Sequence, residues 1–245
     1  MYIRVFALVI SSVLFTWSGS MKAAEKAEST PELFYDFKDP ANDIILNRSG
    51  YYSDINLRSN NDRKVQIKDG AIHFIQGSSA QSTKAPANLI GTIKRSNSLS
   101  LELWFKPTNL NQKGPARIFS LSGGTSDRNL TIGQEGRALQ VRIRTTKTSN
   151  NGLPAMESTP LLKNQITHAF YTFGENEAKL YINGKLIRKK RIEGNLSNWE
   201  SDYLFFIGNE STGNRPWLGS IYSLAFYKKV IGKDEIIRKF NSGVS

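Results

Sequence analysis

From residue 33 onward, the chain is a series of short apolar or alternating runs separated by Gly, Asn, Ser and Pro. In residues 99–105 the odd positions are Leu or Phe, and the even positions are Ser, Glu and Trp. Residues 139–144 alternate in the same way, with two arginines among the polar positions. Alternation of period two is typical of a strand with one buried face. The pattern predicts an all-β fold, a two-sheet antiparallel jelly-roll sandwich, with strands over 33–37, 65–68, 71–74, 99–106, 116–122, 129–133, 138–145, 167–174, 177–182, 185–192, 203–208 and 219–227.

Two turns and one helix complete this pattern. An Asn-Gly pair at 183–184 lies between alternating runs and predicts a tight hairpin, because a type I′ turn needs positive φ at both central residues. An Asp-Gly pair at 69–70 predicts a similar turn. Residues 234–240 predict a short C-terminal helix that packs on the sandwich through Ile236, Ile237 and Phe240.

The N-terminus has the layout of a secretory signal peptide, since Arg4 precedes an apolar run over 5–17 and small residues follow. This run of 13 residues is short for a membrane span, which needs about 20. We therefore predict a signal peptide over 1–24, a flexible leader over 25–32 and one domain over 33–245. The protein would be secreted or periplasmic with no transmembrane span after cleavage, or held by an N-terminal membrane anchor if the segment is not cleaved.

Cysteine content and charge narrow the chemistry. The chain has no cysteine, which excludes disulfides, thiolate catalysis and cysteine-ligated zinc, and a cysteine-free exported protein is typical of bacteria. The formal net charge is +12, and +10 remains without residues 1–24, which hold Arg4 and Lys22 but no acid. Such a surface attracts polyanions, of which acidic polysaccharides are one class. Solubility alone is the other explanation of the charge.

The order of several motifs resembles the LamG-like jellyroll domain of the concanavalin A-like lectin/glucanase superfamily. The matching segments are 33–37 (Leu-Phe-Tyr-Asp-Phe), 98–107, 180–185 (Leu-Tyr-Ile-Asn-Gly-Lys), 207–209, 215–222 and the closing helix. The resemblance covers residues 33–243. It implies two antiparallel sheets packed face to face and a role in binding glycans or proteins, although the superfamily also holds glucanases and lyases.

The resemblance leaves calcium in doubt. Many relatives carry an acid in the closing strand that helps to hold calcium, where this chain has Tyr222 and Ser223. Calcium needs six to eight oxygen ligands, usually with several carboxylates. We predict no cofactor and no metal site, and leave open a different calcium site built from Asp36, Asp39, Asp43 and Asp54.

The sequence predicts no catalytic residues. The retaining glucanases of the superfamily place acids as Glu-x-Asp-x-x-Glu on one strand, and no such run occurs. Glu102 stands alone and is interpreted as an exposed carboxylate, while Glu175 and Glu177 lie in a turn. The two histidines, His73 and His168, are interpreted as structural or solvent-facing. The chain also lacks a Gly-x-Ser-x-Gly nucleophile elbow.

The first candidate ligand site is the loop that precedes the last strand. Trp217 is the predicted stacking ring, and Asn209, Glu210 and Arg215 are predicted to hydrogen-bond a sugar. The alternative is that Trp217 lies under its own loop and that Arg215 pairs with Glu210. Trp104 and Trp199 are predicted to pack inside the fold.

The second candidate is a basic surface made of Arg142 and Arg144 together with Arg188 and Lys190. It forms only if their two strands are neighbours in one sheet. Such a surface would recognise charge, and its binding would weaken with salt. The alternative is a solvated charged strand that protects a sheet edge against pairing.

The leading hypothesis is an exported, non-catalytic module that binds a polysaccharide or other glycan, in particular an anionic one. One alternative is a protein-interaction module whose partner is an envelope protein. Another is a polysaccharide lyase or hydrolase with an unrecognised site. No specific nucleic-acid partner is predicted.

Overall fold

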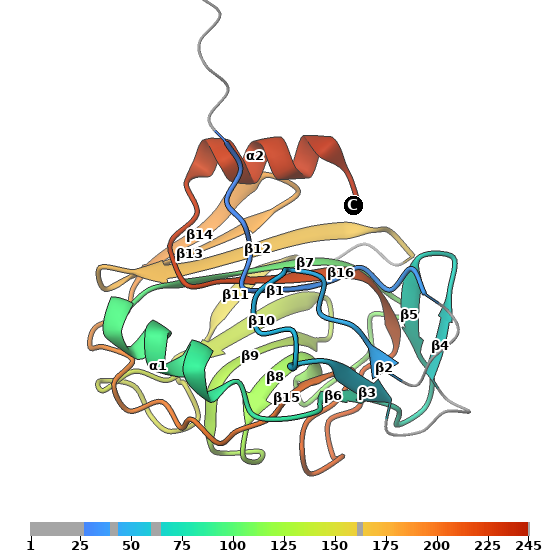
Figure 1. Ribbon diagram of the computed structural model, residues 1–245, viewed down its shortest axis with the longest axis horizontal. Helices are drawn as coiled ribbons and strands as arrows, with labels where there is room; N and C mark the ends of the chain where they lie inside the picture. The colour runs from blue at the N-terminus through green and yellow to red at the C-terminus, as the bar shows by residue number, and fades with distance from the viewer. Residues whose placement is uncertain (1–26, 40–43, 60–64, 161–163, 245) are drawn as a thin grey trace, which may run out of the picture.

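The computed structural model describes residues 27–39, 44–59, 65–160 and 164–244, so the predicted signal peptide lies outside the described residues. Within those ranges the chain forms two antiparallel sheets of eight strands each, which pack face to face (Figure 1). The predicted jelly-roll sandwich is confirmed. No helix in the described ranges is long and apolar enough to cross a membrane.

The first sheet, sheet A, consists of β1 (Leu33–Tyr35), β4 (Val65–Lys68), β5 (Ala71–Phe74), β7 (Leu99–Pro107), β12 (Thr167–Gly174), β13 (Glu177–Ile182), β14 (Lys185–Arg191) and β16 (Gly219–Tyr227). Their order is β14-β13-β12-β7-β16-β5-β4, and β1 pairs with β16. The predicted Asn-Gly turn joins β13 to β14, with φ of 49° at Asn183 and 70° at Gly184.

The second sheet, sheet B, consists of β2 (Ile44–Ile45), β3 (Leu57–Ser59), β6 (Ala80–Ser82), β8 (Ala116–Ser122), β9 (Arg128–Glu135), β10 (Ala138–Ile143), β11 (Met156–Pro160) and β15 (Phe205–Ile207). Their order is β11-β10-β9-β8-β15-β6-β3-β2. The strands β2, β3, β6 and β11 were not among the predicted ones. They have two to five residues each, too few to show an alternating pattern.

The core lies between the inner faces of the two sheets. The odd positions of β7 that alternate as Leu and Phe are all fully buried, and the apolar positions of β9 and β10 oppose them from sheet B. Each such side chain contributes roughly 1.5–3 kcal/mol when it leaves water. A helix that was not predicted, α1 (Ala87–Ser96), closes one end of the sandwich with Leu89, Ile90 and Ile93 (Figure 1).

The predicted C-terminal helix is α2 (Lys233–Ser242), which covers the outer face of sheet A (Figure 1). Ile236 of this helix is fully buried against the sheet, in a cluster with Phe170 and Tyr227. Phe240 stacks on Trp104, with ring centroids 6.0 Å apart, and on His168 at 5.9 Å. The described part of the predicted leader is bound to this helix, because both the backbone N–H and the hydroxyl of Ser29 donate to the Glu235 carboxylate at 2.7 and 3.0 Å.

The interpretation of Glu102 as an exposed carboxylate is wrong, because α2 covers it. Glu102 is 7% exposed; its Oε1 lies 3.0 Å from His168 Nε2, and its Oε2 accepts a 2.9 Å hydrogen bond from the Tyr227 hydroxyl. Burial opposes ionisation of this carboxyl, but the His168 contact and the nearby Lys239 charge hold its pKa below the usual value. His168 is fully buried, so of the two roles considered for it the structural one is found.

We expect Glu102→Gln to lower the free energy of unfolding by roughly 3 kcal/mol at pH 7, because the two buried partners lose a charged acceptor and one of its two oxygens becomes an NH2 donor. The folded-state pKa is depressed, so this contribution is complete above the ordinary value of 4.5 and is lost as pH falls through the lower folded-state pKa. Urea unfolding of wild type and variant from pH 7 to pH 3 measures the difference, which should narrow below pH 4.5. Glu177→Gln, on the same sheet face, is the control and should lower the free energy of unfolding by less. A stability difference between wild type and Glu102→Gln that does not change with pH would contradict the lowered pKa of Glu102.

Candidate functional site

A β-bulge in β8 turns Arg117 away from the core. Simple alternation would place Arg117 on the same face as Phe119 and Leu121, which both point into the core. The pairing of β8 with β9 shifts register between Arg117 and Phe119, so Arg117 lies opposite Gly133 and faces outward. Bulges re-aim side chains in this way. Gly133 is required there, because a Cβ at this position would lie 2.6 Å from a backbone oxygen of β8.

A second bulge does the same for Arg128 on β9. Alternation would put Arg128 on the core face with Leu130, but the register shifts between their pairs, and Arg128 lies opposite Ser122. Its Nη1 donates to Thr131 Oγ1 at 3.3 Å, and its Nη2 donates to the carbonyl oxygen of Thr125. The two bulges thus bring two arginines to the outer face of sheet B.

A third arginine reaches this face from β10 without a bulge. Arg142 lies opposite Thr131 of β9, on the side away from the core, as the alternation predicted. Its Nε donates to Gln140 Oε1 at 2.7 Å and its Nη1 donates to Asn151 Oδ1 at 3.0 Å. Side-chain amides, not carboxylates, therefore hold this guanidinium in place.

Loop 209–216 adds a fourth arginine and one carboxylate. Asn209 is 2% exposed and shapes the loop, since its Oδ1 accepts hydrogen bonds from the backbone N–H of Glu210 and of Arg215. The Oε2 atom of Glu210 pairs with Arg117 Nε at 3.1 Å. The sequence alternative paired Glu210 with Arg215, and the structure places it on Arg117 instead.

These four residues, Arg117, Arg128, Arg142 and Arg215, form what we call the arginine cluster. Arg117 and Arg128 are fully buried, whereas Arg142 and Arg215 are half-buried and reach solvent. Among the described residues, Glu210 is the one carboxylate that forms an ion pair with the cluster. The buried Nε atoms of Arg128 and Arg215 have no hydrogen-bond partner there.

The crowding of cations affects the ionisation of the cluster. Burial, reinforced by the charges of Arg117 and Arg142, lowers the pKa of Arg128 to about 9. Burial also lowers the pKa of Arg142, and the Arg215 charge adds to the effect, while Glu135 and Glu157 oppose it. A negative group at the cluster would relieve this repulsion, so the site is suited to an anion.

Trp217 is not a surface ring, contrary to its predicted stacking role. It is 1% exposed, its Nε1 donates to Gln134 Oε1 at 2.9 Å, and its ring packs on Phe74 and Phe105 at centroid distances of 6.3 and 6.2 Å. An indole at the edge of the sandwich gains more from joining the core than from facing water. Trp104 and Trp199 are buried as predicted.

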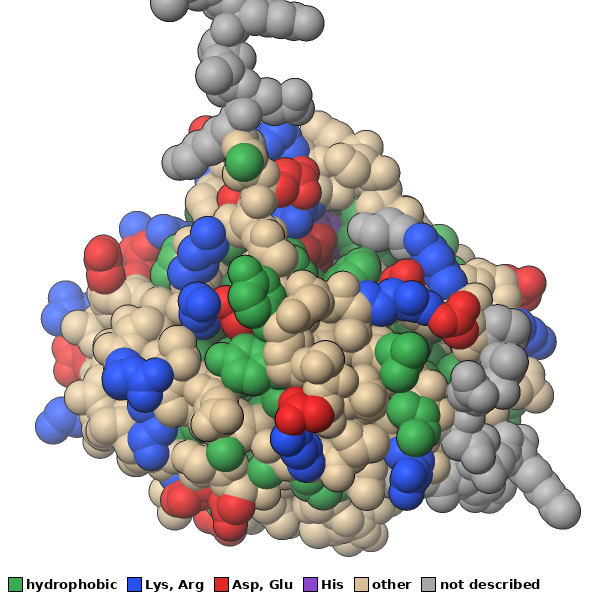
Figure 2. All heavy atoms as spheres, in the orientation of Figure 1, with side chains coloured by type: hydrophobic (Ala, Val, Ile, Leu, Met, Phe, Trp, Pro, Cys, Tyr) green, Lys and Arg blue, Asp and Glu red, His purple; other side chains and the backbone are tan. Residues whose placement is uncertain are grey.

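The predicted joint basic surface does not form, because β10 belongs to sheet B and β14 to sheet A. Lys190 Nζ instead donates to the carbonyls of Pro154 and Ala155 at 3.3 and 3.2 Å, and Arg188 is exposed. Arg144 pairs with Glu200 at 2.9 Å, outside the arginine cluster. On the face shown in Figure 2, Lys and Arg side chains are scattered among Asp and Glu side chains.

The acids considered for calcium are engaged with cations. Asp36 and Asp39 both pair with Arg48, and Asp54 pairs with Lys84. Asp43 lies outside the described residues. Across the described ranges, no three His, Cys, Asp or Glu side chains gather as a metal ion would require.

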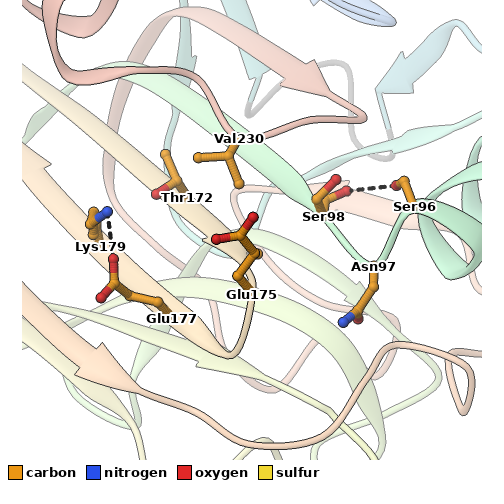
Figure 3. A pocket seen from close by; sticks show the side chains of 9 residues that line it. Ser96, Asn97, Ser98, Thr172, Glu175, Glu177, Lys179 and Val230 are labelled. Carbon is orange, nitrogen blue, oxygen red and sulfur yellow. Dashed lines mark hydrogen bonds and ion pairs between the residues drawn. The ribbon is translucent and has the colours of Figure 1, made fainter.

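A polar groove of about 550 Å³ is lined by residues from the end of α1, from β12 and β13 of sheet A, and by Val230. Figure 3 shows Glu175 from the β12–β13 turn and Glu177 from the start of β13 among Ser96, Ser98, Thr172 and Lys179. Glu177 is paired with Lys179 at 2.5 Å and with Lys189 at 2.6 Å. The charged side chains that line the groove are two glutamates and one lysine, so it lacks the excess positive charge that distinguishes the arginine cluster.

The fold and its sequence motifs place the chain in a known family. Residues 76–237 match the family model described as the concanavalin A-like lectin/glucanases superfamily. This match spans well over half of the chain, which therefore belongs to that superfamily. No curated protein matches the chain.

Solved structures confirm the architecture. The receptor-binding domain of botulinum neurotoxin C/D mosaic serotype matches with a TM-score of 0.69 and 16% identity over 87% of this chain. The binding domain of botulinum neurotoxin DC in complex with SialylT matches with a TM-score of 0.66 and 16% identity over 87% of this chain. A structure of botulinum neurotoxin type C, whose cell entry is described as dependent on interaction with two ganglioside molecules, matches with the same three values. This chain spans about half of each of those chains, 51%. At this identity the likeness establishes the fold.

We expect Trp217→Phe to lower the free energy of unfolding by roughly 2 kcal/mol, because it removes the indole hydrogen bond to Gln134 and leaves a small cavity. Urea denaturation followed by circular dichroism measures the loss. Unchanged stability would mean that the ring is not part of the core.

Proposed function

We propose that this protein is an exported, non-catalytic module that binds acidic glycans through the arginine cluster. The observation that carries the proposal is the gathering of four guanidiniums around a single ion-paired carboxylate on the outer face of sheet B. Buried cations without matching anions are costly to a folded protein. A ligand that supplies the missing negative charge therefore gains binding free energy.

The chemistry of the accessible part favours carboxylate or sulfate groups. A guanidinium is planar and donates paired hydrogen bonds that match the two oxygens of such groups. Arg142 and Arg215 are the half-buried members, and the half-buried Asn151 lies beside Arg142 as an amide that suits sugar hydroxyls. Because Trp217 is buried, recognition here depends on charge and hydrogen bonds and not on ring stacking.

Two further observations support the proposal. The superfamily description includes lectins, and two of the neurotoxin structures are described with SialylT or with gangliosides. Those ligands belong to the toxins. The apolar run over residues 5–17 supports export to the periplasm or the exterior, where a polysaccharide ligand would be met.

The class of ligand is tested with alginate as a polyuronate, heparin as a sulfated chain and dextran as a neutral chain. Isothermal titration at about 50 and 500 mM NaCl should show binding to the acidic chains that weakens at high salt, and none to dextran. Equal binding to dextran, or no binding to either acidic chain at low salt, would refute the proposal.

The site is tested by Arg142→Gln and Arg215→Gln. Each variant should weaken binding to the acidic chain roughly tenfold or more, because a hydrogen bond to a charged group contributes about 1.5–3 kcal/mol. Arg188→Gln on β14 removes the same charge from the other sheet and is the matched control. Equal losses in all three variants would indicate that total charge, and not the cluster, determines binding.

A further inference from the structure

Glu210 is a carboxylate that the loop 209–216 inserts into the arginine cluster. Its side chain is fully buried, although residues 211–214 of the same loop are exposed. Its Oε2 lies 3.1 Å from Arg117 Nε, and its Oε1 accepts a 3.1 Å hydrogen bond from the Thr212 hydroxyl. The loop therefore holds one acidic group where a bound anion would be expected.

The surroundings of this carboxylate are those of an oxyanion site. Arg117 and Arg128 are both fully buried, and both feel the Glu210 charge. Arg128 donates to neutral oxygens of Thr131 and Thr125, and its buried Nε has no partner among the described residues. Glu210 thus pairs directly with Arg117, while Arg128 feels its charge without a hydrogen bond to it and keeps an unused donor for a second or larger oxyanion.

The ends of the loop are fixed independently of Glu210. The backbone N–H of Trp217 donates to the Gly208 carbonyl at 2.8 Å, and the N–H of Arg117 donates to the Arg215 carbonyl at 2.9 Å. Gly208 and Gly213 have φ of 81° and 74°, a region that glycine adopts without strain. A loop with closed ends can rearrange between them, and break hydrogen bonds inside the loop, while the strands beside it stay in place.

We infer that Arg117 and Arg128 form an inner anion subsite, that Glu210 is its internal occupant, and that a carboxylate or sulfate group of an external ligand takes the place of Glu210 when loop 209–216 lifts. The inference rests on the proposed function for the class of ligand. In this arrangement Glu210 competes with the acidic group of the ligand and weakens its binding, and it stabilises the protein when no ligand is bound. The loop then favours ligands whose acidic group reaches below the outer pair, Arg142 and Arg215.

The test uses the full chain with Glu210→Gln and inorganic sulfate as the probe. The variant should unfold roughly 10 °C lower than wild type, because Arg117 loses its counterion. Sodium sulfate should then raise the unfolding midpoint of the variant in a saturable manner, by about 5 °C more than it raises that of wild type. Sodium chloride at equal ionic strength separates this effect from screening.

Glu200→Gln is the matched control, because it removes the carboxylate from another Arg–Glu pair, that of Arg144. Sulfate stabilises folded proteins in general, and this control and wild type report that general gain. If Glu210→Gln gains no more than Glu200→Gln, the inner subsite does not exist and the inference is overturned.

If Glu210→Gln does not fold, hydrogen exchange on the wild-type protein provides the test. Saturating sulfate should speed exchange of the amide of Gly213, which now donates to the Glu210 carbonyl at 3.0 Å, at least severalfold. Unchanged or slower exchange would overturn the inference. Failure of wild type to bind alginate or heparin refutes the proposed glycan function instead, and it leaves the sulfate result for Glu210→Gln to be judged separately.

Discussion

The burial of two apolar sheet faces against each other is the interaction on which the rest of this molecule depends. The chain has no cysteine, so no covalent cross-link can substitute for that core. Each long strand gives alternate side chains to the interior, and its polar side chains are left to the outer faces. The polar chemistry of the sandwich is consequently divided between two surfaces, one on each sheet.

The two outer faces differ in whether their buried charges have matching partners within the protein. On sheet A, α2 covers a carboxylate, but Glu102 has His168 and Tyr227 as close partners, and the pKa of Glu102 stays below its usual value. On sheet B the buried charges are guanidiniums that outnumber the carboxylate paired with them, and the pKa of Arg128 falls to about 9 because burial and neighbouring cations disfavour its charge. The first arrangement is complete within the protein. For the second arrangement we propose that a bound anion supplies the missing negative charge, and for this reason the proposed function is placed on sheet B.

Much of the fold follows from local pattern. The alternation in β7 and β10, the Asn-Gly turn between β13 and β14 and the apolar stripe of α2 each predict an element that the structure contains. The short strands β2, β3 and β6 give no such signal, and α1 was missed although Leu89, Ile90 and Ile93 have helical spacing. Such short elements form because the sandwich offers them an apolar surface, which local sequence does not reveal.

The sequence by itself determined the class of fold, the absence of disulfides, the excess of positive charge and the outward side of Arg142, because each depends on residue type or on a period of two. Only the tertiary structure decided that Trp217 is buried, that β10 and β14 lie in different sheets, and that Glu210 pairs with Arg117. The outward orientation of Arg117 and Arg128 was also decided by the tertiary structure, because the two bulges that orient them arise from the pairing of β8 with β9. A register shift belongs to two strands together, so the alternation of either strand alone places these arginines on the wrong face.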